Sequence, residues 1–271
     1  MADGGGAEFL RRRCGGRSDV TRLLASVRSP EEALIALDGG ADIIDLKDPA
    51  SGALGRLADA VIRDILGAIA GRRPVSATIG DLPLAPLPVR RAVEAMAATG
   101  VDIVKLGIFA GDWAATLAAL APLARDVRLV AVCFGDRPLE LEIVRRAGDA
   151  GFYGVMLDTA EKRGGPLTRH LSAAALARFL DLARAAALLA GLAGSLSAAD
   201  LPLLLPLRPD FLGFRSALTR GGREAPLDAA SVARLRLAIA ASSATAAAGA
   251  QSDATAAMPA SAAGISAAQS R

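Results

Sequence analysis

The chain has 271 residues, of which 52% are hydrophobic and only 3% aromatic, and its formal net charge is +3 at pH 7. The arginines are scattered and no basic run is interleaved with aromatic residues for base stacking, so we expect no nucleic-acid partner. No uninterrupted apolar stretch reaches the roughly 18 residues that a membrane helix needs, so we expect no membrane span either.

Both ends of the chain have a composition unsuited to folding. Residues 1–20 are rich in Gly and Arg, and residues 241–271 are nearly all Ala, Ser, Thr, Gly and Gln. Such segments bury too little apolar surface to offset the entropy of ordering, so we expect both to be disordered. The start lacks the apolar segment of a secretion signal, and Cys14 and Cys133 make no disulfide framework, so we expect a cytoplasmic protein.

Between these ends, residues 21–240 alternate short apolar runs with longer amphipathic ones, which is typical of βα units around a parallel sheet. The expected strands are 23–27, 42–47, 75–79, 102–106, 127–134, 153–157, 188–191 and 210–215. The expected helices are 30–38, 57–70, 88–99, 113–123, 138–150, 173–186, one capped by Ser197, and 228–240. Eight units with short connections predict an α/β fold, a single-domain TIM (β/α)8 barrel with disordered termini.

Lysine is rare in this chain and stands at the ends of expected strands. Of the 31 lysines and arginines, only Lys47, Lys105 and Lys162 are lysines. A chain that has drifted this far toward arginine keeps lysine where an amine, and not only a positive charge, is required. Lys47 and Lys105 end even-numbered strands and Lys162 follows the sixth, so the three amines should meet at the carboxyl-terminal rim, where barrels hold their active sites.

Alternation along the strands places carboxylates among these amines. Asp45 shares the face of Lys47, where we count it among the substrate contacts, and Asp158 ends the sixth strand. A partly desolvated amine beside other cations should have its pKa lowered from about 10.4 toward neutrality, as a Schiff-base lysine requires. Asp158 would then carry a proton or position one amine. An ordinary surface ion pair between Asp158 and Lys162 is the alternative.

The loops after strands seven and eight are where barrels often bind phosphate. Here they offer Gly194 and Ser195 after strand seven, then Gly213 and Arg215, and then a Gly-Gly-Arg run at 221–223. Glycine lets an anion approach backbone N–H groups, and arginine supplies a charged fork. We therefore expect a phosphorylated small molecule to bind in these loops.

Other chemistry has fewer residues to support it. His170 is the only histidine and lies in a polar turn, so no serine nucleophile has a histidine partner. A Mg²⁺ site would have to use carboxylates alone, from Asp45, Asp48 and Asp81. The sequence therefore predicts catalysis without a metal or another cofactor.

Six motifs carry a resemblance to a known family. They are SVRSPEEALIALDGGADIIDLKDPASGALG, PVSATIGDLP, DIVKLGIF, MLDTAEKRGGPL, LAGSL and PDFLGFR. In this order they resemble the (5-formylfuran-3-yl)methyl phosphate synthase family, from about residue 23 to 239. The resemblance implies a class I aldolase-like barrel that condenses two glyceraldehyde 3-phosphate molecules into 4-(hydroxymethyl)-2-furancarboxaldehyde phosphate, releasing phosphate and water, for methanofuran-type cofactors.

The resemblance also implies a role for each candidate residue. Lys47 would be the Schiff-base lysine and Lys105 the proton acceptor, while Asp158 and Lys162 look like participants in proton transfer and phosphate handling. The chain departs from the family pattern at Ser216, where the family tends to have glycine.

Two alternatives remain open. Another class I phosphosugar aldolase would use the same lysines, and a non-catalytic barrel that binds a phosphorylated metabolite would use only the phosphate loops. The alanine-rich helices also leave open whether the chain forms a homo-oligomer, because their outer faces look alike in water and in an interface.

Overall fold

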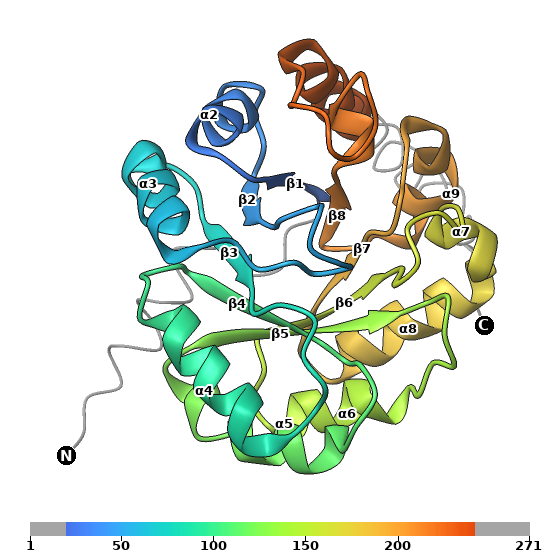
Figure 1. Ribbon diagram of the computed structural model, residues 1–271. Coiled ribbons are helices and arrows are strands. Elements are labelled where there is room, and N and C mark those ends of the chain that lie inside the picture. Colours follow the sequence, from blue (N-terminus) through green and yellow to red (C-terminus); the bar gives the residue numbers. More distant parts are fainter. Residues whose placement is uncertain (1–19, 242–271) are drawn as a thin grey trace, which may run out of the picture.

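The computed structural model describes residues 20–241, which form a closed barrel of parallel strands paired in chain order, with β8 closing onto β1. Figure 1 shows the helices arranged around the outside of these strands. The predicted TIM (β/α)8 barrel is therefore confirmed. The expected disorder of 1–20 and 241–271 falls almost wholly outside the described residues.

The strands are β1 (Arg22–Val27), β2 (Ile43–Leu46), β3 (Val75–Thr78), β4 (Ile103–Gly107), β5 (Arg128–Phe134), β6 (Gly154–Asp158), β7 (Leu189–Leu192) and β8 (Phe211–Phe214). The helices are α2 (Pro30–Asp38), α3 (Asp59–Ile69), α4 (Pro86–Ala97), α5 (Trp113–Leu120), α6 (Glu142–Asp149), α7 (Leu167–His170), α8 (Ala173–Ala185) and α9 (Leu201–Leu204), and a last helix covers 229–241. Every predicted strand is present, with its ends displaced by no more than one residue.

Helix starts follow their capping residues. Ser29 caps α2 by accepting a hydrogen bond from the backbone N–H of Glu32, and Ser197 caps a short 3₁₀ turn before α9, as predicted. The prediction that the fifth helix begins at about 138 was wrong, because this helix, α6, begins at Glu142. The residues before it form a loop in which Glu140 accepts a hydrogen bond from the indole of Trp113.

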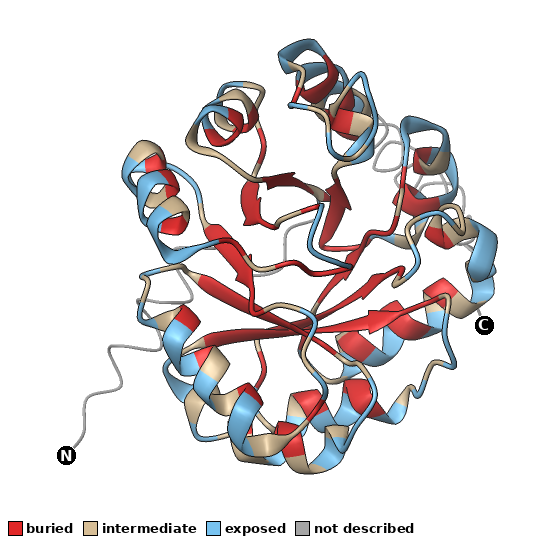
Figure 2. Cartoon of the chain, viewed as in Figure 1, coloured by how far each residue is buried: buried red, intermediate tan, exposed pale blue. Residues whose placement is uncertain are grey.

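Alternation along each strand separates two apolar layers. The side chains of Ile44, Val104 and Val155 pack between the strands and the helices, whereas Ile43 and Met156 belong to a second cluster inside the barrel. Figure 2 shows the consequence: the strands are buried over nearly their whole length, while the helices are buried mainly on the sides that face them. This separation agrees with the alternation expected along the strands.

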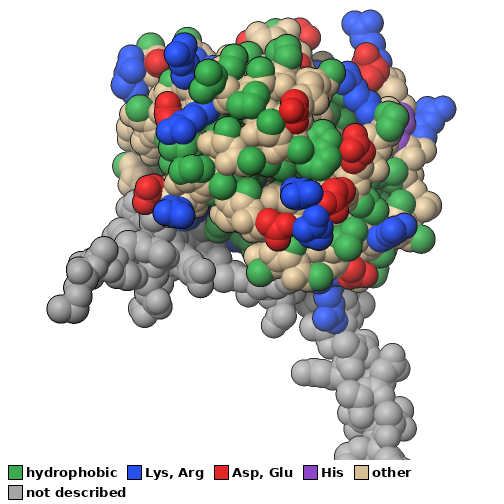
Figure 3. Space-filling model, turned by 90° about the horizontal axis from the view of Figure 1, so that it is seen from below, with side chains coloured by type: hydrophobic (Ala, Val, Ile, Leu, Met, Phe, Trp, Pro, Cys, Tyr) green, Lys and Arg blue, Asp and Glu red, His purple; other side chains and the backbone are tan. Residues whose placement is uncertain are grey.

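The surface carries charges of both signs. Figure 3 shows acidic and basic side chains mixed with hydrophobic ones on the face seen from below. Exposed ion pairs occur on the helices, as between Arg145 and Asp149 on α6. Within residues 20–241, no helix combines the length and the apolar character that crossing a membrane would require.

Candidate active site

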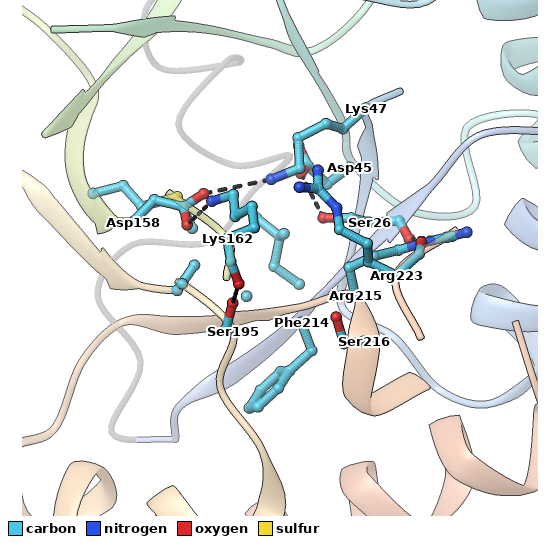
Figure 4. Close-up of a pocket in the computed structure, with 15 residues that line it drawn as sticks. Ser26, Asp45, Lys47, Asp158, Lys162, Ser195, Phe214, Arg215, Ser216 and Arg223 are labelled. Carbon is cyan, nitrogen blue, oxygen red and sulfur yellow. Dashed lines mark hydrogen bonds and ion pairs between the residues drawn. The ribbon is translucent and has the colours of Figure 1, made fainter. Parts of the chain in front are cut away.

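A pocket opens at the carboxyl-terminal ends of the strands, between β1, β2, β6, β7 and β8. Its lining residues are Leu24, Ser26, Asp45, Lys47, Met156, Asp158, Lys162, Ala193, Gly194, Ser195, Gly213, Phe214, Arg215, Ser216 and Arg223. Figure 4 shows Lys47 and Lys162 converging on Asp158, while Arg215 and Arg223 come from the part of the pocket that follows β8. Of the residues singled out from the sequence for catalysis or phosphate binding, Lys105 and the two glycines of the 221–223 run are not in this lining.

Two amines share one carboxylate at the centre of the pocket. The Nζ atom of Lys47 lies 3.4 Å from Oδ2 of Asp158, and Nζ of Lys162 lies 2.6 Å from Oδ1. Lys162 also donates to the backbone carbonyl of Thr159. The side chains of Lys47, Asp158 and Lys162 are 10%, 3% and 13% exposed, so the cluster is nearly buried yet open to the pocket. The alternative of a surface ion pair is therefore excluded for Asp158 and Lys162.

Burial and charge set the protonation of this cluster. Burial alone would raise the pKa of Asp158, but the ammonium groups of Lys162 and Lys47 outweigh it and hold that pKa below its ordinary value. Burial lowers the pKa of Lys162 to about 8, against the attraction of Asp158 and with help from the positive charge of Lys47. Asp158 is therefore an ionised acceptor at neutral pH, beside an amine that titrates close to neutrality.

The β6–α7 loop that carries Lys162 is held by backbone hydrogen bonds. The carboxylate of Asp136 accepts from the N–H groups of Ala160 and Glu161, at 2.8 and 2.7 Å. From the neighbouring loop, Ser195 donates through Oγ to the backbone carbonyl of Lys162. Asp136 was not predicted from the sequence. Its carboxylate binds backbone N–H groups of the loop, and such contacts do not depend on which side chains the loop carries.

Lys105 lies deeper than the sequence indicated. The expectation that it ends the fourth strand was wrong, because β4 continues to Gly107 and the Lys105 side chain, 3% exposed, is below the pocket. Its Nζ is 2.5 Å from Oδ1 of Asp45, a residue that does line the pocket. Burial lowers the pKa of Lys105, and Asp45 opposes this shift.

Asp45 is fully engaged by groups of the barrel interior. Besides Lys105, its carboxylate accepts hydrogen bonds from Ser76 at 2.6 Å and from Ser26 at 3.0 Å. Burial would raise the pKa of Asp45, but Lys105 and Lys47 hold it below its ordinary value. Because an ionised carboxylate repels phosphate, this geometry favours a role in holding Lys105 over the predicted contact with a phosphorylated substrate.

Arg215 is not the open phosphate fork that was expected. Its guanidinium has five N–H donors, and the carboxylate of Glu32 and three backbone carbonyls accept them all. The Glu32 contacts are 2.5 and 3.0 Å long. Arg215 therefore holds the loop after β8 against α2 and β1. Glu32 was not among the residues singled out from the sequence.

The carboxylates considered for a metal are occupied separately. Asp81 accepts from the backbone N–H groups of Ala53 and Leu54, while Asp48 accepts from Ala50 and Ser51. Across residues 20–241, no three potential metal ligands come together. His170, at the end of α7, is likewise not part of the pocket lining.

Fold and site together define a (β/α)8-barrel enzyme whose chemical groups are amines and carboxylates at the carboxyl-terminal rim. Solved structures agree on the fold: phosphoribosyl anthranilate isomerase from Thermus thermophilus superposes with a TM-score of 0.60 at 20% identity, covering 82% of this chain and 99% of its own. A 3-hexulose-6-phosphate synthase gives a TM-score of 0.56 at 20% identity, covering 80% and 99% of the two chains.

Sequence comparison defines the family. The family model described as 4-HFC-P synthase matches residues 23–236. The (5-formylfuran-3-yl)methyl phosphate synthase of Methanosarcina mazei is 36% identical over 217 residues, which cover 74% of this chain and 92% of the relative. A Methylorubrum extorquens protein provisionally named for the same activity is 42% identical over 214 residues, covering 79% and 89%. The chain belongs to the (5-formylfuran-3-yl)methyl phosphate synthase family of enzymes.

Proposed function

We propose that this enzyme condenses two molecules of glyceraldehyde 3-phosphate into 4-(hydroxymethyl)-2-furancarboxaldehyde phosphate through a Schiff base on Lys47, in the biosynthesis of methanofuran-type cofactors. The observation that carries the proposal is the position of Lys47, whose amine meets an ionised carboxylate at the floor of a pocket. The names of the relatives support the product, and the geometry supports the covalent step.

The first step needs an uncharged amine. Asp158, 3.4 Å away, orients the Lys47 amine; once this amine has lost its proton to water in the pocket, it attacks the carbonyl carbon of the first triose phosphate and forms a carbinolamine. The ammonium of Lys162, whose pKa is lowered to about 8, can give a proton to the departing hydroxyl group, which leaves as water while the C=N bond forms. Asp158 stays ionised throughout and holds Lys162 in place at 2.6 Å.

The next step removes a proton from the carbon beside the imine, which gives an enamine that can attack the second triose phosphate. Lys105 can accept this proton after its own ammonium has released one, which burial favours by lowering the pKa of Lys105. Asp45 lines the pocket and Lys105 lies behind it, so the proton that leaves the substrate reaches the uncharged Lys105 amine most directly through Asp45. The serines that bind Asp45 fix its oxygens for this transfer. Lys105 thereby accepts the proton of the substrate through Asp45, without contacting the substrate itself.

Product analysis tests the function. The purified chain is incubated with glyceraldehyde 3-phosphate, and the mixture is followed by furan absorbance, by NMR and by release of inorganic phosphate. We expect a furan aldehyde that retains one phosphate, with one phosphate released. A six-carbon product that keeps both phosphates would instead identify an ordinary aldolase, and unchanged substrate would favour a binding protein.

A further inference from the structure

The charges around the pocket do not cancel. Asp45 is balanced by Lys105, and Arg215 is balanced by Glu32. The charged lining residues that remain are Lys47, Lys162 and Arg223 against Asp158 alone, an excess of two positive charges. Just outside the lining, Asp48 and Arg28 add one charge of each sign. The excess matches the charge of a phosphate monoester, which carries close to two negative charges at neutral pH.

Arg223 is the cation of this set with the most donors to offer. Within residues 20–241, its guanidinium makes one hydrogen bond, from Nη2 to the backbone carbonyl of Gly52 at 3.2 Å, and no ion pair with a carboxylate. Four of its five N–H donors are therefore open to a ligand. Its charge also reaches Lys162, whose pKa it helps to lower, so the two cations act on the same part of the pocket.

The backbone at Arg223 is fixed by the arginine that was expected to bind phosphate. Nε of Arg215 donates to the backbone carbonyl of Arg223 at 2.7 Å, and the paired Glu32 immobilises Arg215 itself. The two arginines therefore differ in role. The buried Arg215 fixes the conformation of the loop, and the partly exposed Arg223 lines the pocket. Such pre-organisation reduces the entropy lost when an anion binds.

We propose that Arg223 is the specificity-determining residue that binds a phosphate group of the substrate, in the same part of the pocket as Lys162. The inference rests on the proposed function for the identity of the substrate. What it adds is that the guanidinium of Arg223, and not that of Arg215, makes the enzyme prefer a phosphorylated triose to an unphosphorylated one.

Binding measurements without turnover test this inference. Arg223→Gln and Arg223→Lys are compared with Arg220→Gln, a matched control on the same loop whose side chain is 73% exposed and pairs with Asp228. Calorimetric titration uses sn-glycerol 3-phosphate as the probe and glycerol as the uncharged reference. We expect Arg223→Gln to weaken glycerol 3-phosphate binding by about 10-fold to 100-fold, Arg223→Lys to recover part of the loss, and Arg220→Gln to bind like the parent enzyme.

Turnover provides the second readout. In Arg223→Gln the KM for glyceraldehyde 3-phosphate should rise by a similar factor while kcat changes little. The reason is that Arg223 contacts the phosphate group, which is not the part of the substrate that reacts with Lys47. If Arg223→Gln does not fold, as judged by circular dichroism, Arg223→Lys keeps a donor for Gly52 and serves in its place, with an affinity loss of at least several-fold expected.

The inference is overturned if the Arg223 variants bind glycerol 3-phosphate as tightly as Arg220→Gln, or if they lower kcat alone. Its failure can be told apart from failure of the proposed function. Furan formation with an unchanged KM in Arg223→Gln would refute the role of Arg223 only. Arg223-dependent phosphate binding without any furan product would refute the proposed reaction only.

Discussion

The barrel holds two groups of buried lysine and carboxylate side chains that differ in balance and in access. In the deep group, Lys105 faces Asp45, and two serines complete the hydrogen bonds of the carboxylate. In the upper group, Lys47 and Lys162 compete for the single carboxylate of Asp158 beside the open pocket. The deep group is electrically neutral, whereas the upper group carries one extra positive charge.

This difference indicates where the chemistry occurs. A one-to-one pair with satisfied hydrogen bonds resists change, because removing either partner leaves a buried charge uncompensated. In the upper group Lys162 has the short contact and Lys47 only a 3.4 Å contact with Asp158, so Lys47 is the amine held less firmly. We infer that the upper group reacts and that the deep group supports it.

Replacing Lys47 should have the largest effect. Without its amine no Schiff base can form, so Lys47→Ala should lower kcat by on the order of 10³-fold or more, as measured by furan formation. Lys47→Arg is the matched control because it keeps the positive charge but not the nucleophile, and it should be equally inactive. An active Lys47→Arg enzyme would mean that this position supplies only charge.

Asp158→Asn should have the next largest effect on catalysis. The neutral amide no longer orients the Lys47 amine or holds the Lys162 ammonium as proton donor, so kcat should fall by about 10²-fold to 10⁴-fold while the fold is retained. The corresponding control in the deep group is Ser26→Ala, which removes one hydrogen bond to Asp45 and should lower kcat far less. Equal losses in the two variants would remove the distinction between the groups.

Asp45→Asn should affect stability in addition to rate. It leaves the Lys105 ammonium buried without its counter-charge, which should cost about 3–5 kcal/mol of unfolding free energy in urea denaturation. Asp149→Asn, at an exposed ion pair, should change that free energy by less than about 1 kcal/mol. The double change Asp45→Asn with Lys105→Met should recover part of the loss. Equal costs for Asp45→Asn and Asp149→Asn would contradict the structural role of the deep pair.

The smallest predicted effect is the pH dependence of Lys162. Its pKa is lowered from 10.5 to about 8 in the folded chain, so it is an ammonium below that pH and loses its charge above it. The KM for glyceraldehyde 3-phosphate should therefore be flat below about pH 8 and rise severalfold above it. Lys162→Arg, charged throughout this range, should abolish the rise, and a rise that persists in this variant would assign the titration to another group.

The same shift has a consequence for stability. Between about pH 8 and 10.5 the unfolded chain keeps a proton that folded Lys162 has released, so the contribution of this group to stability increases with pH. Lys162→Met should remove this contribution, which chemical denaturation at several pH values would detect as a shallower slope.

The sequence predicted the strands well because burial on both sides makes each one a short, sharply bounded apolar run. The sequence also predicted that Lys47, Asp158 and Lys162 lie close together, because their positions follow from the ends of the strands and the topology of the barrel. The depth of Lys105 could not be predicted in this way. Lys105 pairs with Thr78 and Val130 inside the sheet, two residues before the end of β4, and no composition signal marks this register.

The role of Arg215 was beyond the sequence for a different reason. Its partner Glu32 lies 183 positions away, and the two meet only because β8 closes onto β1 beside α2. Until the partner is known, a buried arginine next to a glycine has the appearance of a phosphate ligand. Long-range pairing of this kind decides whether an arginine is occupied, as Arg215 is, or available, as Arg223 is.

Covalent trapping tests the central claim most directly. The enzyme is incubated with glyceraldehyde 3-phosphate and sodium borohydride, digested, and mapped by mass spectrometry, with Lys47→Arg treated in parallel. The account predicts a reduced triose phosphate adduct on Lys47 and none on the variant. An adduct on Lys105 or Lys162 in place of Lys47, or furan formation without any trapped lysine, would contradict it.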